Sequence, residues 1–167
     1  MKARRHFVAF LAGAATVTAF SPLDLFPVAL AALAVLANLW LTAPGARTAA
    51  WLGFWFGLGL FGVGVSWVFI SLHRFGAMPA PLAAILALYP ALAGALQARF
   101  RRAPYAVRAA LVIPAAWTLA EWLRATLFTG FPWLTLGSAV LDTPLAGYSP
   151  LGGVYGASFV VAACAGL

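Results

Sequence analysis

Glu121 and Arg124 are the residues of this sequence whose types and spacing could do chemistry inside an apolar segment. They are three positions apart, so on a helix they share one face and can form an ion bridge. Trp117, four positions before Glu121, falls on the same face. Ionisable groups at membrane depth are costly and are therefore usually paired or functional. Two interpretations stay open: a polar patch that meets a lipid head group, and a structural ion pair at the membrane interface.

The stretch that follows this pair, residues 129–134 (TGFPWL), is unusual for a loop. It is too apolar for an exposed loop and too rich in glycine and proline for a helix. Irregular backbone at membrane level survives only where it is packed in protein or lines a cavity. We therefore expect a re-entrant or interface-lying segment. Phe131 and Trp133 would either form the wall of a lipid site or anchor the chain at the interface, and the residues alone slightly favour anchoring.

A complete catalytic set does not accompany these residues in the sequence. Lys2 is the only lysine, and it is predicted at the opposite end of the helices from Glu121. Cys164 is the only cysteine, so an internal disulfide is excluded, and we expect it to be a small buried side chain. His6 and His73 fall on opposite sides, so the sequence predicts no metal site and no cofactor.

The composition requires that these residues belong to a membrane protein. Of 167 residues, 65% are hydrophobic and 8% are charged, and the mean hydropathy is +1.00. A soluble domain carries about 25% charged residues, so soluble, disordered and disulfide-stapled classes are excluded. The net charge of +7 could suggest a nucleic-acid partner. Its basic residues instead cluster at the ends of apolar runs, where determinants of membrane topology lie, so no nucleic acid is expected.

The gaps between charged residues divide the chain into about six apolar segments. Each is near the 17–25 residues that a membrane-spanning helix needs. The segments are residues 7–23, 25–46, 48–72, 75–98, 104–128 and 150–167. We therefore expect an all-α fold, a polytopic transmembrane helix bundle. Residues 1–167 would form one N-terminal transmembrane domain, with an irregular outer-rim loop near 129–150.

The basic residues also predict the orientation. With the N-terminus in the cytoplasm, eight of the ten fall inside, and only Arg74 and Arg124 fall outside. This places residues 129–153 on the outer side. The start of the chain also resembles a cleavable signal peptide, with a small-residue site at 17–19 (VTA). The next span follows so closely that a retained helical hairpin is the simpler account.

Small residues and tryptophans predict how the helices pack and where they end. Gly53 with Gly57, and Gly62 with Ser66, have the four-residue spacing that lets helix backbones approach. Helix packing is the favoured interpretation, and a groove for a lipid chain is the alternative. Three tryptophans near predicted span ends are expected at the membrane interface: Trp40, Trp51 and Trp67.

Several blocks of the sequence, in order, resemble the N-terminal membrane region of the apolipoprotein N-acyltransferase family. They are 19–24 (AFSPLD), 57–62 (GLGLFG), 66–71 (SWVFIS), 75–79 (FGAMP), 121–124 (EWLR), 129–134 (TGFPWL), 144–147 (PLAG) and 150–154 (PLGGV). Several ordered blocks are more specific than any single one, and TGFPW is the most telling of them.

The resemblance implies an enzyme of lipoprotein maturation in the bacterial inner membrane. The family moves an acyl chain from a phospholipid donor to the α-amine of the lipid-modified N-terminal cysteine of an apolipoprotein acceptor. It works through a thioester on a cysteine, with glutamate and lysine partners, in a nitrilase-like domain on the outer side. None of those three residues is matched here, so no catalytic residue carries over and Cys164 is not the nucleophile. The expected substrate-binding residues are Trp133, Phe131, Pro132, Glu121 and Arg124.

The last apolar segment has no basic flank at Leu167, unlike the earlier inward ends. We therefore expect a sequence cut before the catalytic domain, inactive alone, and monomeric in its membrane lipid. Two other interpretations are a small multi-span transporter and a non-catalytic structural membrane subunit. The polar residues lie near the outer end of the helices, whereas transporters place theirs near the midplane, which argues against the transporter.

Overall fold

The computed structural model describes residues 2–66 and 79–167, and all regular structure within them is helical. This confirms the expected all-α class. The longer elements are α1 (Lys2–Thr16), α2 (Phe26–Leu41), α3 (Ala46–Gly64), α5 (Pro79–Gln97), α7 (Ile113–Thr126) and α8 (Ser149–Gly166). A short α6 (Tyr105–Val107) and a π-helical turn, η4 (Arg108–Val112), lead into α7. Three 3-10 segments follow α7: η5 (Leu127–Thr129), η6 (Leu136–Val140) and η7 (Pro144–Tyr148).

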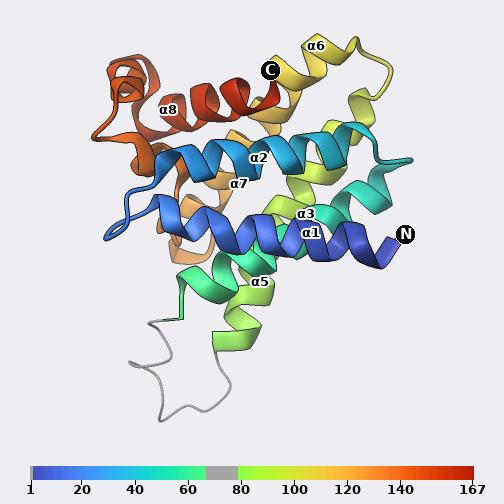
Figure 1. Cartoon of the computed structure of the whole chain (residues 1–167), viewed down its shortest axis with the longest axis horizontal. Coiled ribbons are helices and arrows are strands. Elements are labelled where there is room, and N and C mark those ends of the chain that lie inside the picture. The colour runs from blue at the N-terminus through green and yellow to red at the C-terminus, as the bar shows by residue number, and fades with distance from the viewer. Residues whose placement is uncertain (1, 67–78) are drawn as a thin grey trace.

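Helix α3 is central to the packing, because it lies between α1 and α5. Helix α7 packs between α5 and α8, and α2 packs against α1 and α8. The bundle has two distinct ends (Figure 1). We call one the basic end; it holds the N-terminus, the α2–α3 turn and the α5–α6 connection. We call the other the loop end; it holds the α1–α2 turn and the segment after α7.

Two prolines shape the helical paths, one at the start of α2 and one within the path from α6 to α7. Pro27 lies in the first turn of α2, where a missing N–H costs nothing. Pro114 falls inside the continuous path from α6 to α7, and it cannot donate to the carbonyl four residues earlier. The path widens into the π turn η4 directly before this proline. The predicted segment 104–128 is therefore one helical path with a local widening.

Among the described residues, two helical paths are long and apolar enough to cross a membrane: Ala80–Phe100, with 21 residues, and Tyr105–Thr126, with 22. Phe26–Leu41 and Gly152–Gly166 are apolar but shorter.

The expected boundaries of the first span were wrong, because α1 begins at Lys2 and ends at Thr16. Arginines near the N-terminus lie within the helix and do not mark its start, since a long side chain can reach polar surroundings from a helical position. Residues 67–78, with Trp67, His73 and Arg74, lie outside the described part.

The small residues of α3 bring helix backbones into contact. A Cβ on Gly53 would overlap the carbonyl oxygen of Pro90, and one on Gly57 would lie 2.7 Å from the Cα of Ala87. Both partners belong to α5. This contact matches the packing interpretation of the spacing, whereas Gly62 faces open space.

Trp40 lies near the end of α2, as expected, but its ring does not face the surroundings of the bundle. Its side chain is buried, and its indole N–H donates to the carbonyl of Ala49 at 2.9 Å across the α2–α3 turn. Because this bond satisfies the only polar atom of the side chain, the whole ring can be buried. Trp51, by contrast, is half-exposed.

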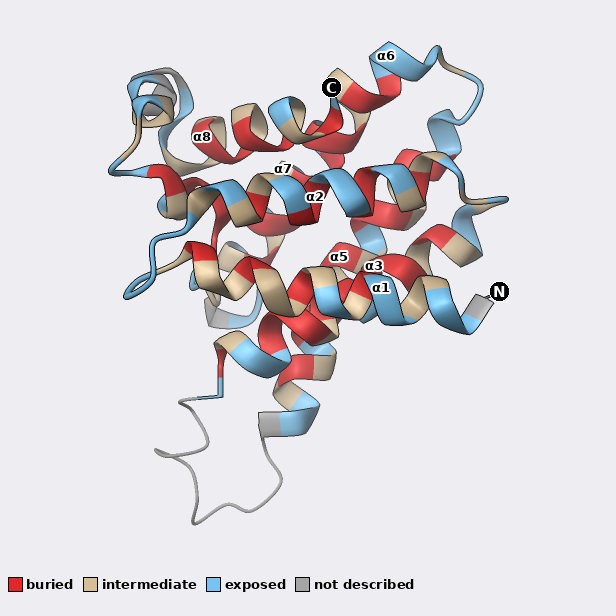
Figure 2. Cartoon of the chain, in the orientation of Figure 1, coloured by how far each residue is buried: buried red, intermediate tan, exposed pale blue. Residues whose placement is uncertain are grey.

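Exposed positions run along the outer faces of the helices (Figure 2), and many of them carry large apolar side chains. Exposed examples lie on α1, α2 and α5: Phe7, Leu11, Val35, Ile85 and Leu88. A soluble monomer rarely exposes a continuous apolar surface, so this pattern is typical of helices that face lipid. Cys164 is also exposed on α8, so the prediction of a buried thiol was wrong. A small apolar residue on such a helix can face lipid as readily as the core.

Candidate functional site

The site is built on the last turns of α7, where Glu121 and Arg124 are 4% and 2% exposed. Their spacing predicted an ion bridge. The structure shows that each side chain bonds to the segment that follows α7 and not to the other charge. The two buried charges therefore act on one piece of chain, which together with the next residue, Gly137, spans residues 130–137 and which we call the rim loop.

Arg124 binds the first half of the rim loop through carbonyl oxygens. Its Nη1 donates to the carbonyls of Phe131 and Trp133, the latter at 2.6 Å. Its Nη2 donates to the hydroxyl of Thr135 at 3.3 Å, and that hydroxyl donates to the carbonyl of Pro132 at 2.6 Å. Arginine suits this role, because its planar guanidinium offers several donors in a fixed geometry.

Glu121 binds the second half of the rim loop. Its Oε1 accepts the backbone N–H of Leu136 at 2.8 Å, at the start of η6. The next N–H, of Gly137, is donated to the hydroxyl of Ser158 on α8 at 2.8 Å. The side chains of Ser158 and Trp117 also neighbour the carboxylate. The start of η6 is thus held by one carboxylate and one hydroxyl from two different helices.

The backbone at the end of α7 explains how the rim loop turns back over the helix. Phe128 and Gly130 have positive φ values of 51° and 80°. At Gly130 a Cβ would also overlap the carbonyl oxygen of Ala125, so glycine is required for both reasons. The reversal lets the N–H of Phe131 donate to the carbonyl of Arg124 at 2.8 Å.

The aromatic residues of the rim loop lie on two sides of its backbone. Phe131 is partly buried against the core, while Pro132 is exposed and Trp133 is 54% exposed. The rings of Phe131 and Trp133 lie 5.1 Å apart between centroids. All five sequence-predicted site residues therefore meet in this one region of the loop end.

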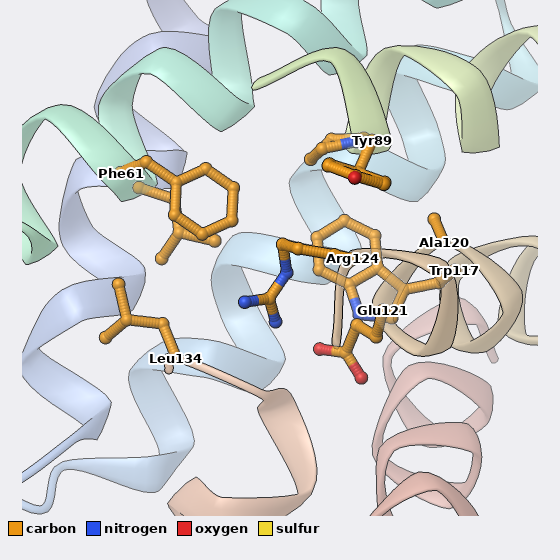
Figure 3. A pocket seen from close by; sticks show the side chains of 9 residues that line it. Phe61, Tyr89, Trp117, Ala120, Glu121, Arg124 and Leu134 are labelled. Atoms are coloured by element: carbon orange, nitrogen blue, oxygen red, sulfur yellow. The ribbon is translucent and has the colours of Figure 1, made fainter. Parts of the chain in front are cut away.

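A narrow pocket of about 10 Å³, roughly the room of one water molecule, lies beside the two charges. Figure 3 shows the Arg124 side chain directed between Phe61 and Leu134, with Tyr89 and Trp117 on the other side. The guanidinium carbon lies 5.3 Å from the centre of the Phe61 ring, a cation–π contact. The lining is apolar apart from the two charges and the polar ends of Tyr89 and Trp117.

Sequence reasoning found Trp117 and missed the other partners. Phe61 and Tyr89 come from α3 and α5, and Ser158 comes from α8. Nothing in the local pattern of those segments connects them to α7. Thr135 directly follows the TGFPWL block, and that position is the one signal that could have indicated it.

The comparisons with known proteins agree on one family. Residues 12–167 match the family model described as the apolipoprotein N-acyltransferase N-terminal domain. A protein of Nitrosomonas europaea named apolipoprotein N-acyltransferase is 48% identical over 94% of this chain and 33% of its own length. Proteins with the same name from Ralstonia nicotianae and Coxiella burnetii are 46% and 42% identical, over 99% and 95% of this chain and 34% of their own length.

The chain spans about a third of the length of these curated relatives. The matches run through both charged residues of α7 and the rim loop, since they cover nearly the whole chain. This chain belongs to the apolipoprotein N-acyltransferase family, within the region of its N-terminal domain.

Proposed function

We propose that this chain is the membrane part of an N-acyltransferase that completes the lipid modification of bacterial lipoproteins. In this reaction the ester bond between an acyl chain and a phospholipid breaks, and an amide bond forms to the α-amine of the lipid-modified N-terminal cysteine of an apolipoprotein. The amine loses a proton, and the phospholipid leaves as a lysophospholipid with a restored hydroxyl. The names of the relatives and the family match support this reaction.

The observation that supports a substrate role for the loop end is how the rim loop is held. Two buried charges and one buried hydroxyl hold this loop, although its outer side carries an exposed proline and a half-exposed tryptophan. Fixing exposed aromatic groups beside a narrow apolar pocket prepares a surface for an acyl chain. We assign Phe131, Pro132 and Trp133 to the lipid path, and Glu121 and Arg124 to its support.

We propose that the residues that break and form bonds in this reaction belong to the part of the full-length protein that this chain does not cover. The pocket offers a carboxylate, a guanidinium and aromatic walls, and the carboxylate is already engaged with the rim loop. Residues 1–167 would then act as an N-terminal transmembrane domain that binds and orients substrates.

The proposed placement is the bacterial inner membrane, with about six spans, a cytoplasmic N-terminus, the rim loop on the outer side, and a monomeric chain. The separation of charge supports the orientation, because the basic end carries most of the arginines, whereas Asp24, Glu121 and Asp142 lie in the α1–α2 turn, the last turns of α7 and the segment after α7.

The test uses the full-length protein reconstituted with phospholipid and a diacylated model lipopeptide. Mass spectrometry should show the lipopeptide gaining one acyl chain, together with an equal amount of lysophospholipid. A lipopeptide that keeps its mass in the presence of folded protein would contradict the proposal. Substrate-dependent flux without acyl transfer would favour the transporter instead.

A further inference from the structure

A second hollow, lined by arginines, lies at the basic end of the bundle. Arg99, Arg101 and Arg102, at and beyond the end of α5, line it together with Ala98 and with Ala46 at the start of α3. It is open to the surroundings and has a volume of about 370 Å³. We call it the arginine hollow. The proposed acyl transfer makes no use of it, because the rim loop is at the other end.

The positive charge of the arginine hollow is not balanced within the chain. The sequence contains three acids: Asp24 in the α1–α2 turn, Glu121 in the last turns of α7, and Asp142 in the segment after α7, all away from the basic end. The polar contact described for these arginines is with the backbone: Arg101 Nη1 donates to the carbonyl of Pro44 at 3.2 Å. Three guanidinium groups around one hollow repel one another unless an anion joins them.

A buried arginine next to the arginine hollow adds to this imbalance. Arg108 is 8% exposed, and its Nη2 donates to the side-chain oxygen of Gln97 at 3.0 Å. Its Nε is buried without a hydrogen-bond partner among the described residues. Gln97 directly precedes Ala98 and Arg99 of the lining. The local field therefore favours an anion even when the exposed arginines are screened.

An apolar groove begins beside these arginines. Phe100, between Arg99 and Arg101 in sequence, lines a hollow of about 280 Å³ with Leu96 of α5 and with Leu111 and Leu119 on the α6–α7 path. In the part of the chain that the structure describes, those two helical paths are long and apolar enough to cross a membrane. The cationic side chains at the end of these helices suit the phosphate head group of a phospholipid. The apolar groove that runs inward from them suits one of its acyl chains.

We propose that the arginine hollow binds the phosphodiester head group of an anionic phospholipid from the leaflet at the basic end. Guanidinium groups bind the oxygens of phosphates and carboxylates in pairs, and the apolar groove beside the hollow favours the phosphodiester of a lipid over a soluble anion. One acyl chain of the lipid lies in the groove beside Phe100. Such a lipid would balance the charge of the basic end and hold the α5–α6 connection against the start of α3.

The experiment measures lipid binding to the full-length protein in detergent by native mass spectrometry. Phosphatidylglycerol should bind more tightly than phosphatidylcholine of the same chain length. The double variant Arg99→Gln/Arg102→Gln should bind phosphatidylglycerol about 30-fold more weakly, since each basic residue near a lipid surface contributes about 1 kcal/mol. Arg101 is kept in this variant because it also bonds to Pro44.

The matched control is Arg4→Gln/Arg47→Gln, which removes two exposed arginines from the same end but none from the lining. It should change binding by less than about threefold. Equal losses in both doubles would overturn the proposal in favour of diffuse attraction. Competition by inorganic phosphate at the lipid's own concentration would also overturn it, because a free oxyanion would then be the ligand.

If the glutamine double does not fold, Phe100→Ala tests the same site. It should weaken binding of long-chain phosphatidylglycerol and leave the water-soluble short-chain form unchanged. Equal effects on both chain lengths would contradict the placement of the acyl chain. The readout is lipid binding and not acyl transfer, so failure here is distinguishable from failure of the proposed function.

Discussion

At the scale of single residues, the site depends on where two buried charges find their partners. Arg124 donates to loop carbonyls, and Glu121 accepts a loop N–H. Buried charges are costly unless they are paired or hydrogen-bonded, and Glu121 Oε2 has no hydrogen-bond partner among the described residues. These two residues therefore link the stability of α7 to the shape of the rim loop, and substitutions at each should have different effects.

Replacing Arg124 with glutamine should destabilise the protein substantially. The variant loses several donors to the rim loop and leaves Glu121 without its neighbouring positive charge, a change that costs about 3 kcal/mol in buried networks. Thermal unfolding of the full-length protein in detergent should show a clear drop in Tm. Arg4→Gln, at an exposed position on α1, is the control and should leave Tm unchanged. Equal Tm values for the two variants would show that the loop contacts contribute nothing.

Glu121→Gln should be tolerated much better than Glu121→Ala. The glutamine side-chain oxygen can still accept the N–H of Leu136, whereas alanine leaves that buried donor unsatisfied at about 1–3 kcal/mol. Tm and acyl transfer should both be nearly retained in the glutamine variant and reduced in the alanine variant. Loss of acyl transfer in Glu121→Gln at normal Tm would indicate a direct role for the negative charge in substrate binding.

At the scale of elements, the rim loop is a short irregular segment with a fixed path. The reversal at Gly130 brings Phe131 back over α7, and the cap on Leu136 begins η6. Irregular backbone near a membrane is stable only when its polar groups are bonded within the protein. Here carbonyls and N–H groups of the loop are bonded by side chains of α7 and α8.

Gly130→Ala should distort this element. The added Cβ would overlap the carbonyl of Ala125, and φ at this position is +80°. We expect the free energy of unfolding to fall by about 2 kcal/mol. The rate of acyl transfer should fall as well, because a shift at Gly130 displaces the whole rim loop. Gly147→Ala in η7 is the control, since its Cβ would meet nothing within 4 Å. Unchanged activity in Gly130→Ala would show that the loop path does not matter.

The sequence predicted the helical class and the shared face of Trp117 and Glu121, because hydropathy and helical spacing are local properties. It could not predict the partners of Arg124, since a helical spacing rule considers only residues on the same helix. Ser158 reaches the site by the folding of α8 onto η6, a contact across 21 positions. The predictions of a buried Cys164 and of an interfacial Trp40 ring failed for one reason. An apolar residue in a membrane protein can face either the lipid or the core of the bundle.

At the scale of the whole molecule, charge is divided between the ends of the bundle. The basic end carries the N-terminal, α3 and α5–α6 arginines, and the three acids lie away from it, in the α1–α2 turn, the last turns of α7 and the segment after α7. Such a division predicts orientation in a membrane, with the basic end in the cytoplasm.

Cysteine labelling should confirm this orientation. Gly147→Cys and Gly45→Cys introduce thiols at open positions of opposite ends, and Cys164→Ala removes the exposed native thiol. In intact spheroplasts, a membrane-impermeant maleimide should add label to the Gly147 variant and not to the Gly45 variant, relative to the parent protein. The reverse pattern would place the rim loop in the cytoplasm, away from the proposed outer-side chemistry.

The most direct test of a substrate role for the rim loop compares two half-exposed tryptophans in the full-length enzyme. Trp133 is 54% exposed on the rim loop, and Trp51 is 48% exposed near the basic end. The rate of lipopeptide acylation, followed by mass spectrometry at several phospholipid concentrations, should fall at least about tenfold in kcat/KM for Trp133→Ala, a loss of about 1.4 kcal/mol in transition-state binding. It should stay within about twofold of the parent for Trp51→Ala. Equal rates for the two variants at equal Tm would contradict the assignment of the rim loop to the substrate path.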